Sequence, residues 1–250
     1  GNNAQIRVFN GASFANGNVA PARTFGKLSS PAINVASLFL DTAADRLYVG
    51  DSFNGAVLVY NSASTKNTLV DPDRTITGFN VVAGVQVDTA LDILYVSNCS
   101  PNCSPTSAFT ILVFDSASAS TLNGAVAPNR TITPHINTSD MPVGDLFVDK
   151  ANDRLYVAGG QNTVVMVFDT AHSANGSTAP TKTLTFPVVG NPLFANLRNV
   201  IVDTVHDHLY AVAGTAIFSL TNASSANGSV TGNAALAPIG SSFSAIAVSP

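Results

Sequence analysis

The chain has 250 residues, of which 46% are apolar and only 10% are charged, and its formal net charge is −4. A typical soluble domain carries about 25% charged residues, so Asn, Ser, Thr, Gly and Ala must cover most of this surface. The net negative charge argues against nucleic acid as a partner, because phosphate binding needs clustered Lys and Arg. No apolar run reaches the roughly 18 residues of a membrane-spanning helix, so we expect no membrane span.

From the N-terminus onward, one short apolar segment recurs about every 50 residues. Its five copies are IRVFN, VLVYN, ILVFD, VMVFD and IFSLT, which end at Asn10, Asn61, Asp115, Asp169 and Thr221. Most copies are followed by an Asn-Gly loop and then by a short segment such as ARTF, DRTI, NRTI or TKTL. A second motif lies between them, as FLDTAADRLYV, QVDTALDILYV, FVDKANDRLYV and IVDTVHDHLYA. A repeat of this length is typical of solenoids and propellers.

Each repeat predicts four short strands, which are rich in β-branched and aromatic residues and bounded by Gly, Asn, Asp or Pro. No stretch keeps the 3.6-residue period of a helix, so we expect almost no helix. Four-stranded units repeated radially form a β-propeller. The expected fold is therefore all-β, with a single β-propeller domain over residues 1–250 and four-stranded antiparallel blades.

Five copies of the VFD-type segment predict five blades. The RLYV-type segment occurs only four times, and residues 244–250, SAIAVSP, are the candidate for the fifth strand that ends in Val-Asp elsewhere. We therefore expect both termini to close the last blade. Its missing RLYV-type strand leaves two alternatives: residues 244–250 pair directly with IRVF, or another segment fills the gap. The start at Gly1, without Met or a signal-like segment, favours a mature or trimmed product.

Taken together, P-x-G-x-x-V-D, R-L-Y-V, I-x-V-F-D-x-A-S and A-P-x-R-T-I resemble the NHL/YVTN-type repeat of secreted bacterial and archaeal propellers over nearly the whole chain. Propellers of this kind include lyases, lactonases and plain binding modules, so the resemblance implies a fold more than a function. Those that carry out metal chemistry place several carboxylate, Asn or His ligands at the channel entrance. The matching positions here are Ser37, Gly84, Asp145, Asn199 and Ala245. They offer too few ligands for a divalent cation.

Propeller geometry assigns the loops to two faces. The uniform turns DTAAD, DTALD, DKAND and DTVHD lie on one face, and their first carboxylates can accept bonds from nearby backbone N–H groups. We expect no cofactor; the alternative is a ring of carboxylates that binds calcium through Asp41, Asp88, Asp149 and Asp203. The loops of the other face vary in length and are the candidate binding surface. The binding candidates near its channel mouth are Ser37, Asp145, Arg198 and Asn199, with an ion pair expected between Asp145 and Arg198.

Cations begin the outer strands of several repeats, at Arg23, Arg74, Arg130 and Lys182. We expect them to protect exposed strand edges against pairing. Cys99 and Cys103 lie in the loop SNCSPNCSP, and their spacing suits a disulfide, with two free thiols as the alternative. A disulfide predicts an extracellular or cell-surface location, or the periplasm.

Three functions fit these features. The first is a secreted, non-enzymatic recognition or scaffold module with a protein or cell-surface partner, including itself, that assembles into a cell-surface layer or filament. The second is an NHL-like lyase or lactonase that acts at the channel mouth through His135, Asp145 and Arg198. The third is a carbohydrate-binding module, which would need exposed aromatic side chains. There is no Trp, and the loop candidates are Phe53, Phe79, Phe109 and Phe194.

Overall fold

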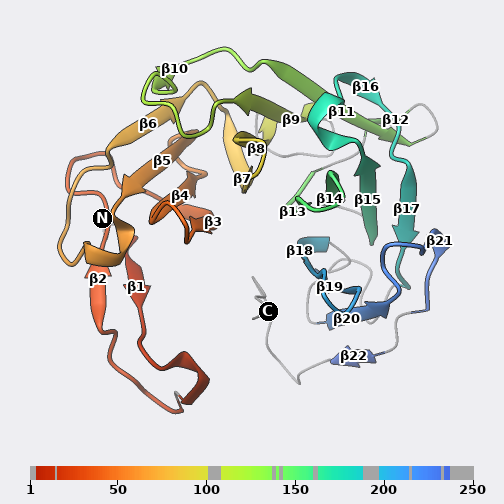
Figure 1. Ribbon diagram of the computed structural model, residues 1–250, viewed down its shortest axis with the longest axis horizontal. Helices are drawn as coiled ribbons and strands as arrows, with labels where there is room; N and C mark the ends of the chain where they lie inside the picture. Colours follow the sequence, from red (N-terminus) through yellow and green to blue (C-terminus); the bar gives the residue numbers. More distant parts are fainter. Residues whose placement is uncertain are drawn as a thin grey trace.

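The computed structural model describes residues 4–14, 16–100, 108–136, 139–140, 143–159, 163–187, 197–213, 216–231 and 234–236. These residues form strands arranged around a common centre, with an opening between the N-terminal hairpin and the last strand (Figure 1). The only helical elements among them are three single turns, η1 (Ala12–Phe14), η2 (Ala63–Thr65) and η3 (Ala171–Ser173). The expected all-β propeller with almost no helix is therefore confirmed.

Four antiparallel blades follow one another along the chain, each beginning with its innermost strand. Blade 1 consists of β3 (Val35–Asp41), β4 (Arg46–Asp51), β5 (Ala56–Asn61) and β6 (Arg74–Thr77). Blade 2 consists of β7 (Val81–Asp88), β8 (Ile93–Ser100), β9 (Ala108–Asp115) and β11 (Arg130–Ile136), with β12 (Ser139–Asp140) beside β11. Blade 3 consists of β13 (Leu146–Asp149), β14 (Arg154–Ala158), β15 (Val164–Asp169) and β17 (Lys182–Thr185). Blade 4 consists of β18 (Leu197–Asp203), β19 (His208–Ala213), β20 (Ala216–Thr221) and β22 (Ala234–Leu236).

The prediction of five blades is wrong for the described residues, which build four. The first copy of the repeat forms only a two-stranded sheet of β1 (Ile6–Val8) and β2 (Arg23–Phe25), with no inner strand beside it among these residues. The fifth inner strand was expected from residues 244–250, which lie outside the described residues. Five copies of an outer strand pair therefore do not by themselves make five blades.

The core lies between the blades, because alternate residues of a strand face opposite sides of its sheet. In β5, Val57 and Val59 pack toward blade 2, whereas Leu58 and Tyr60 pack toward the β1–β2 sheet. All four side chains are 1% exposed or less. Such a blade cannot bury both faces alone, and the neighbouring units on its two sides supply the missing contacts.

A further short strand covers the outer edge of each of the first three blades. It comes from the Asn-Gly loop of the next blade and runs parallel to the edge strand. The covering strands are β10 (Gly124–Ala125) on β6, β16 (Gly176–Thr178) on β11 and β21 (Gly228–Ser229) on β17. Neighbouring blades are thus joined by main-chain hydrogen bonds as well as by apolar packing.

Arg74 shows that the cations of the outer strands do not serve as exposed edge protection. Its side chain is 6% exposed, and its guanidinium donates to the carbonyls of Ala117, Ala119 and Leu122 in blade 2 at 2.7–3.1 Å. Arg23 and Lys182 likewise reach carbonyls of the following blade. The cation therefore joins its edge strand to a loop of the next blade, and the Ala117 and Ala119 carbonyls also accept bonds from the Tyr48 hydroxyl and the Leu122 N–H. The expectation of edge protection was wrong at these three positions.

Candidate functional site at the ring centre

Side chains from separate blades meet at the ring centre around Asp145, which immediately precedes β13. Ser37 of β3 donates through Oγ to Asp145 Oδ1 at 3.3 Å, and Asn199 of β18 donates through Nδ2 to Asp145 Oδ2. Ser37 Oγ also accepts a bond from the backbone N–H of Val85 in β7 at 3.1 Å. The cluster therefore links all four blades, and it contains the described residues that were expected at the channel entrance.

Gly84 belongs to the cluster because it lets Asp145 approach β7. A Cβ atom at this position would lie 2.9 Å from the Cα of Asp145 and 3.0 Å from its Oδ1. Real Cβ atoms do not come so close, so any larger residue would displace the carboxylate. Ala245, the fifth expected position, lies outside the described residues.

The Asp145 carboxyl has a pKa raised to about 7, and the largest cause is desolvation by burial. Hydrogen bonds from the backbone of Leu146 and from Ser37 and Asn199 act in the opposite direction, because they stabilise the charged form. The result is a carboxyl that changes protonation near neutral pH in the middle of the ring. Such a group can hold a proton, donate a hydrogen bond when neutral, or accept one when charged.

Arg198 and His135, the other residues of the enzyme hypothesis, lie apart from this carboxylate. The backbone carbonyl of Arg198 accepts a bond from the Asp145 N–H at 3.2 Å, but its side chain is exposed. The expected side-chain ion pair is therefore replaced by a main-chain contact. His135 lies on β11, an outer strand of blade 2, with its Nδ1 3.1 Å from Ser177 Oγ of β16. The three residues do not converge on one reaction centre.

The four Asp residues that end the inner strands bond within their own turns. Asp88 Oδ1 accepts from the N–H groups of Ala90 and Leu91 at 2.8 and 3.0 Å, and Asp41 and Asp203 make the same kind of contact. Asp149 accepts from both the N–H and the side-chain amide of Asn152. Within the described ranges, no three His, Cys, Asp or Glu side chains gather as a metal site would require. Calcium binding stays a prediction, and these turns supply no cluster for it.

A second Asp in each of these turns, which sequence reasoning missed, ties the turn to the loop after the third strand. In blade 1, Asp45 accepts from the N–H and the Oγ of Ser64 at 2.8 and 2.7 Å. The same pair recurs as Asp92 with Ser118 and as Asp207 with Ser224. The sequence does contain a signal for this contact. The second Asp of the DTAAD-type turn and the Ser of the ASx loop recur together in the same repeats. The contact also places these two loops on one face of the ring.

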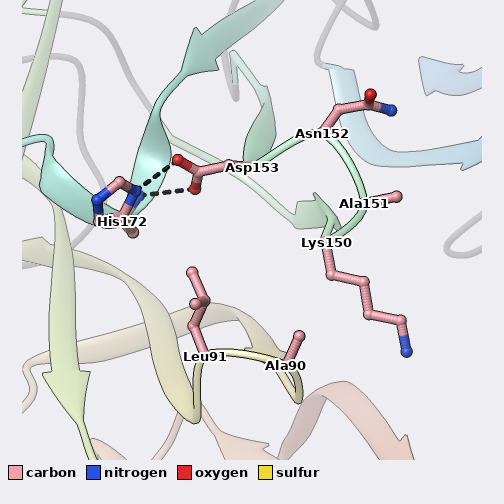
Figure 2. Close-up of a pocket in the computed structure, with 7 residues that line it drawn as sticks. All are labelled: Ala90, Leu91, Lys150, Ala151, Asn152, Asp153 and His172. Atoms are coloured by element: carbon pink, nitrogen blue, oxygen red, sulfur yellow. Dashed lines mark hydrogen bonds and ion pairs between the residues drawn. The ribbon is translucent and has the colours of Figure 1, made fainter.

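Blade 3 carries His172 in place of this serine, beside a shallow pocket (Figure 2). The pocket has a volume of about 480 Å³ and lies between the turns of blades 2 and 3. Its lining residues are Ala90, Leu91, Lys150, Ala151, Asn152, Asp153 and His172. Lys150 Nζ donates to Thr89 Oγ1 at 3.3 Å, which joins the two turns across one end. The pocket is open, and His172, which Asp153 holds, lies on the opposite side from Lys150, whose side chain points away from the histidine (Figure 2).

The opposite face carries an exposed aromatic side chain on a fixed loop. Asp51 is 1% exposed, and its carboxylate accepts bonds from the backbone N–H groups of Asn34, Phe53 and Asn54 at 3.0–3.3 Å. Phe53 itself is 74% exposed. The loop is therefore rigid at its base and presents an apolar group to solvent. Of the other loop aromatics, Phe79 and Phe109 are buried, and Phe194 lies outside the described residues.

Cys99 is buried at the end of β8. Its expected partner, Cys103, lies outside the described residues, so the disulfide stays a prediction. The described part of the chain contains no helix with the length and apolarity to cross a bilayer.

Comparison with known proteins supports the fold alone. No family model matches the chain, so the resemblance to NHL-type repeats stays a prediction. No curated protein matches it either. Among solved structures, it is similar to a chain of a mitotic checkpoint complex, with 20% identity over 87% of this chain and a TM-score of 0.52. It is also similar to U3-55K, with 12% identity over 81% of this chain and a TM-score of 0.51. The matches cover only 57% and 52% of those two chains.

Proposed function

We propose that this protein is a non-enzymatic propeller scaffold that binds other proteins outside the cell, including further copies of itself. The observation that carries the proposal is the display of Phe53 on a loop anchored by the buried Asp51, on the face with variable loops. A fixed, exposed apolar side chain is the kind of anchor that protein interfaces use. The β-propeller fold is consistent with such a scaffold, and one of the similar solved structures is a protein complex.

The central cluster supports the scaffold in a second way. Both oxygens of Asp145 accept hydrogen bonds from other blades, so the carboxylate cross-links the ring. A polar group used in this manner stabilises the arrangement of blades on which the binding loops depend. Secretion is part of the proposal through the predicted disulfide of Cys99 and Cys103.

Binding to native proteins of the source organism tests this proposal, with Phe53→Ser as the loss-of-function variant. Val205→Ser is the matched control, because Val205 is 75% exposed in a turn of the opposite face. We expect quantitative mass spectrometry to identify a protein retained by the wild type and the control but lost with Phe53→Ser. Calorimetry with that purified protein must then give the same order of affinities. Equal retention by all three variants would contradict the proposal.

The lyase or lactonase hypothesis keeps one supporting observation, the raised pKa of Asp145. Perturbed carboxyl groups are common in active sites, although structural networks perturb pKa values as well. Replacing Asp145 with Asn separates the two functions. An enzyme loses hydrolysis of lactone substrates with this change, whereas a scaffold keeps the binding that depends on Phe53.

A further inference from the structure

The three joints between successive blades share one hydrogen-bonding pattern. In each, the Asn of an Asn-Gly loop accepts a bond from an edge-strand N–H of the preceding blade at 2.9–3.1 Å. The donor and acceptor pairs are Thr75 with Asn123, Thr131 with Asn175 and Thr183 with Asn227. The Gly that follows each Asn then starts the parallel covering strand. The same hydrogen bonds therefore join each of the first three blades to the blade that follows it.

Among the described residues, none covers the outer edge of blade 4 in this way. In the part of the chain that the structure describes, β22 pairs only with β20. The registers of blades 3 and 4 align Thr183 with Ala235 and Leu184 with Leu236. The Ala235 N–H of blade 4 therefore corresponds to the Thr183 N–H of blade 3, which points outward and donates to Asn227.

The N-terminal sheet carries the opposite half of the joint. Asn16 and Gly17 stand where Asn227 and Gly228 stand in blade 4, yet no described strand pairs with residues 16–19. Val19 is 41% exposed, whereas its counterpart Val230 is 9% exposed and packs in the core between blades 3 and 4. The two ends of the described fold are therefore a donor edge and an acceptor loop of the same type.

Phe9 gives independent support, because it is the aromatic that should face a preceding blade. It is 41% exposed, whereas its counterparts in the other repeats, Tyr60, Phe114 and Phe168, are 2% exposed or less. On the other side of the opening, Tyr210 and Ile217 are half-buried, although their counterparts in blade 3, Tyr156 and Val165, are buried. Apolar surface is thus left uncovered on both complementary faces.

We infer that the Asn16–Gly17 loop of one copy covers the β22 edge of a second copy, with Ala235 N–H donating to Asn16 Oδ1. This inference names the surface used in the self-association that the proposed function includes, and it rests on that function. Figure 1 places β1–β2 and β22 on the two sides of the ring opening, where they are not paired with one another. Because the two surfaces differ, the contact is head-to-tail and generates a ring or a filament.

The joint between copies is expected to be weaker than the joints within a chain. Arg7 stands where blades 1, 3 and 4 carry the buried Leu58, Met166 and Phe218. Ala234 also replaces the cation that Arg74 and Lys182 provide to the next blade. The loss of these two contributions favours an association that reverses with dilution.

Two variants of the full chain test the inference by sedimentation velocity. Asn16→Ala removes the acceptor, and Ala235→Pro removes the outward N–H. We expect wild-type chains to exceed the monomer mass as concentration rises, and each variant to lower the apparent association constant at least tenfold. A mixture of the two should stop at dimers, because Asn16→Ala keeps a working β22 edge and Ala235→Pro keeps a working loop. Asn227→Ala is the matched control within the chain, and it should lower the unfolding temperature without preventing association.

A wild-type chain that stays monomeric at all concentrations would overturn the inference. Monomers in which Asn16→Ala lowers the unfolding temperature as much as Asn227→Ala would overturn it as well, since the two ends would then meet within one chain. If Ala235→Pro does not fold, Asn16→Ala alone decides between these results. Binding through Phe53 is measured separately, so the scaffold function can fail or survive independently of this joint.

Discussion

His172 Nδ1 lies 2.5 Å from the Asp153 carboxylate, and the backbone N–H of His172 donates to the same carboxylate at 3.0 Å (Figure 2). This pair ties a turn to a loop in blade 3, where the other blades use serine. The histidine side chain is 52% exposed, so it adds a ring to the pocket surface while it keeps the local tie. A substitution in the repeat has therefore changed the surface without changing the connection beneath it.

This contact predicts that substitutions of Asp153 and of His172 have unequal effects on the free energy of unfolding. Asp153→Ala leaves two donors without an acceptor and should lower the free energy of unfolding by about 1–3 kcal/mol. His172→Ser restores the residue of the other repeats and should change it by less than about 1 kcal/mol. Urea unfolding of the two variants measures the difference. Equal losses would show that the histidine ring, and not the shared tie, stabilises blade 3.

Arg74 and Arg130 occupy the same place in successive repeats but have different surroundings. Arg74→Met removes three hydrogen bonds to blade 2, although the Ala117 and Ala119 carbonyls keep the Tyr48 hydroxyl and the Leu122 N–H as donors. It should cost about 1–3 kcal/mol. Arg130 pairs instead with Asp115 of its own blade, through Nη2 and Oδ1 at 2.7 Å, and the aspartate side chain is 43% exposed. Arg130→Met should therefore cost about 1 kcal/mol or less. The midpoints of urea unfolding measure both effects, and a larger loss at Arg130 would contradict the role assigned to Arg74.

The raised pKa of Asp145 predicts an unusual dependence of the free energy of unfolding on pH. Its pKa is about 7 in the folded protein and about 3.9 in an unfolded chain, so the folded state binds the proton more tightly. Its contribution to stability is complete below about pH 4 and is lost as the pH rises to about 7, with an upper limit of about 4 kcal/mol. Asp145→Asn should flatten the profile of unfolding temperature between these values.

Asp203→Asn is the control with the opposite sign. The hydrogen bond from His206 lowers the pKa of Asp203, so this carboxylate contributes stability at higher pH and loses it as the pH falls. Asp203→Asn should therefore remove the loss of stability that this carboxylate causes as the pH falls. If Asp145→Asn leaves the slope between pH 4 and pH 7 unchanged, Asp145 is not the group that titrates there.

Gly84 predicts a steric effect on the central cluster. Gly84→Ala would place a methyl group 2.9 Å from the backbone of Asp145, which cannot move as freely as a side-chain end. We expect a loss of about 1–3 kcal/mol, together with a weaker bond between Asp145 and Asn199. Calorimetric unfolding measures the loss, and NMR of the Asn199 side-chain amide measures the bond. An unchanged amide signal would separate Gly84 from the cluster.

Much of this architecture could be predicted because its signals are local. Segments such as ILVFD and RLYV are rich in β-branched and aromatic residues and are bounded by turn residues. The positions four residues before the last Asp of each inner strand are Ser37, Gly84, Asp145 and Asn199. An even step along a strand keeps side chains on one face, so these positions converge when the blades close around a centre.

The rest depends on contacts between repeats, which no single segment reveals. From the sequence alone, Arg74 is expected to be a surface cation at a strand edge. Its burial is explained by its hydrogen bonds to the next blade. The blade count failed for the same reason, since β1 and β2 contain the outer half of a repeat without an inner strand among the described residues. Asp45 and Ser64 recur in step, but their bond joins two separate loops.

Hydrogen exchange at the Ala235 amide tests most directly the claim that each blade edge is covered by the Asn-Gly loop of a following unit. The amides of Thr75, Thr131 and Thr183 should be protected at every protein concentration, because their asparagine acceptors lie in the same chain. The Ala235 amide should exchange freely in dilute protein and become protected as concentration rises. Protection of Ala235 in the dilute monomer, or its absence in concentrated protein, would contradict the account.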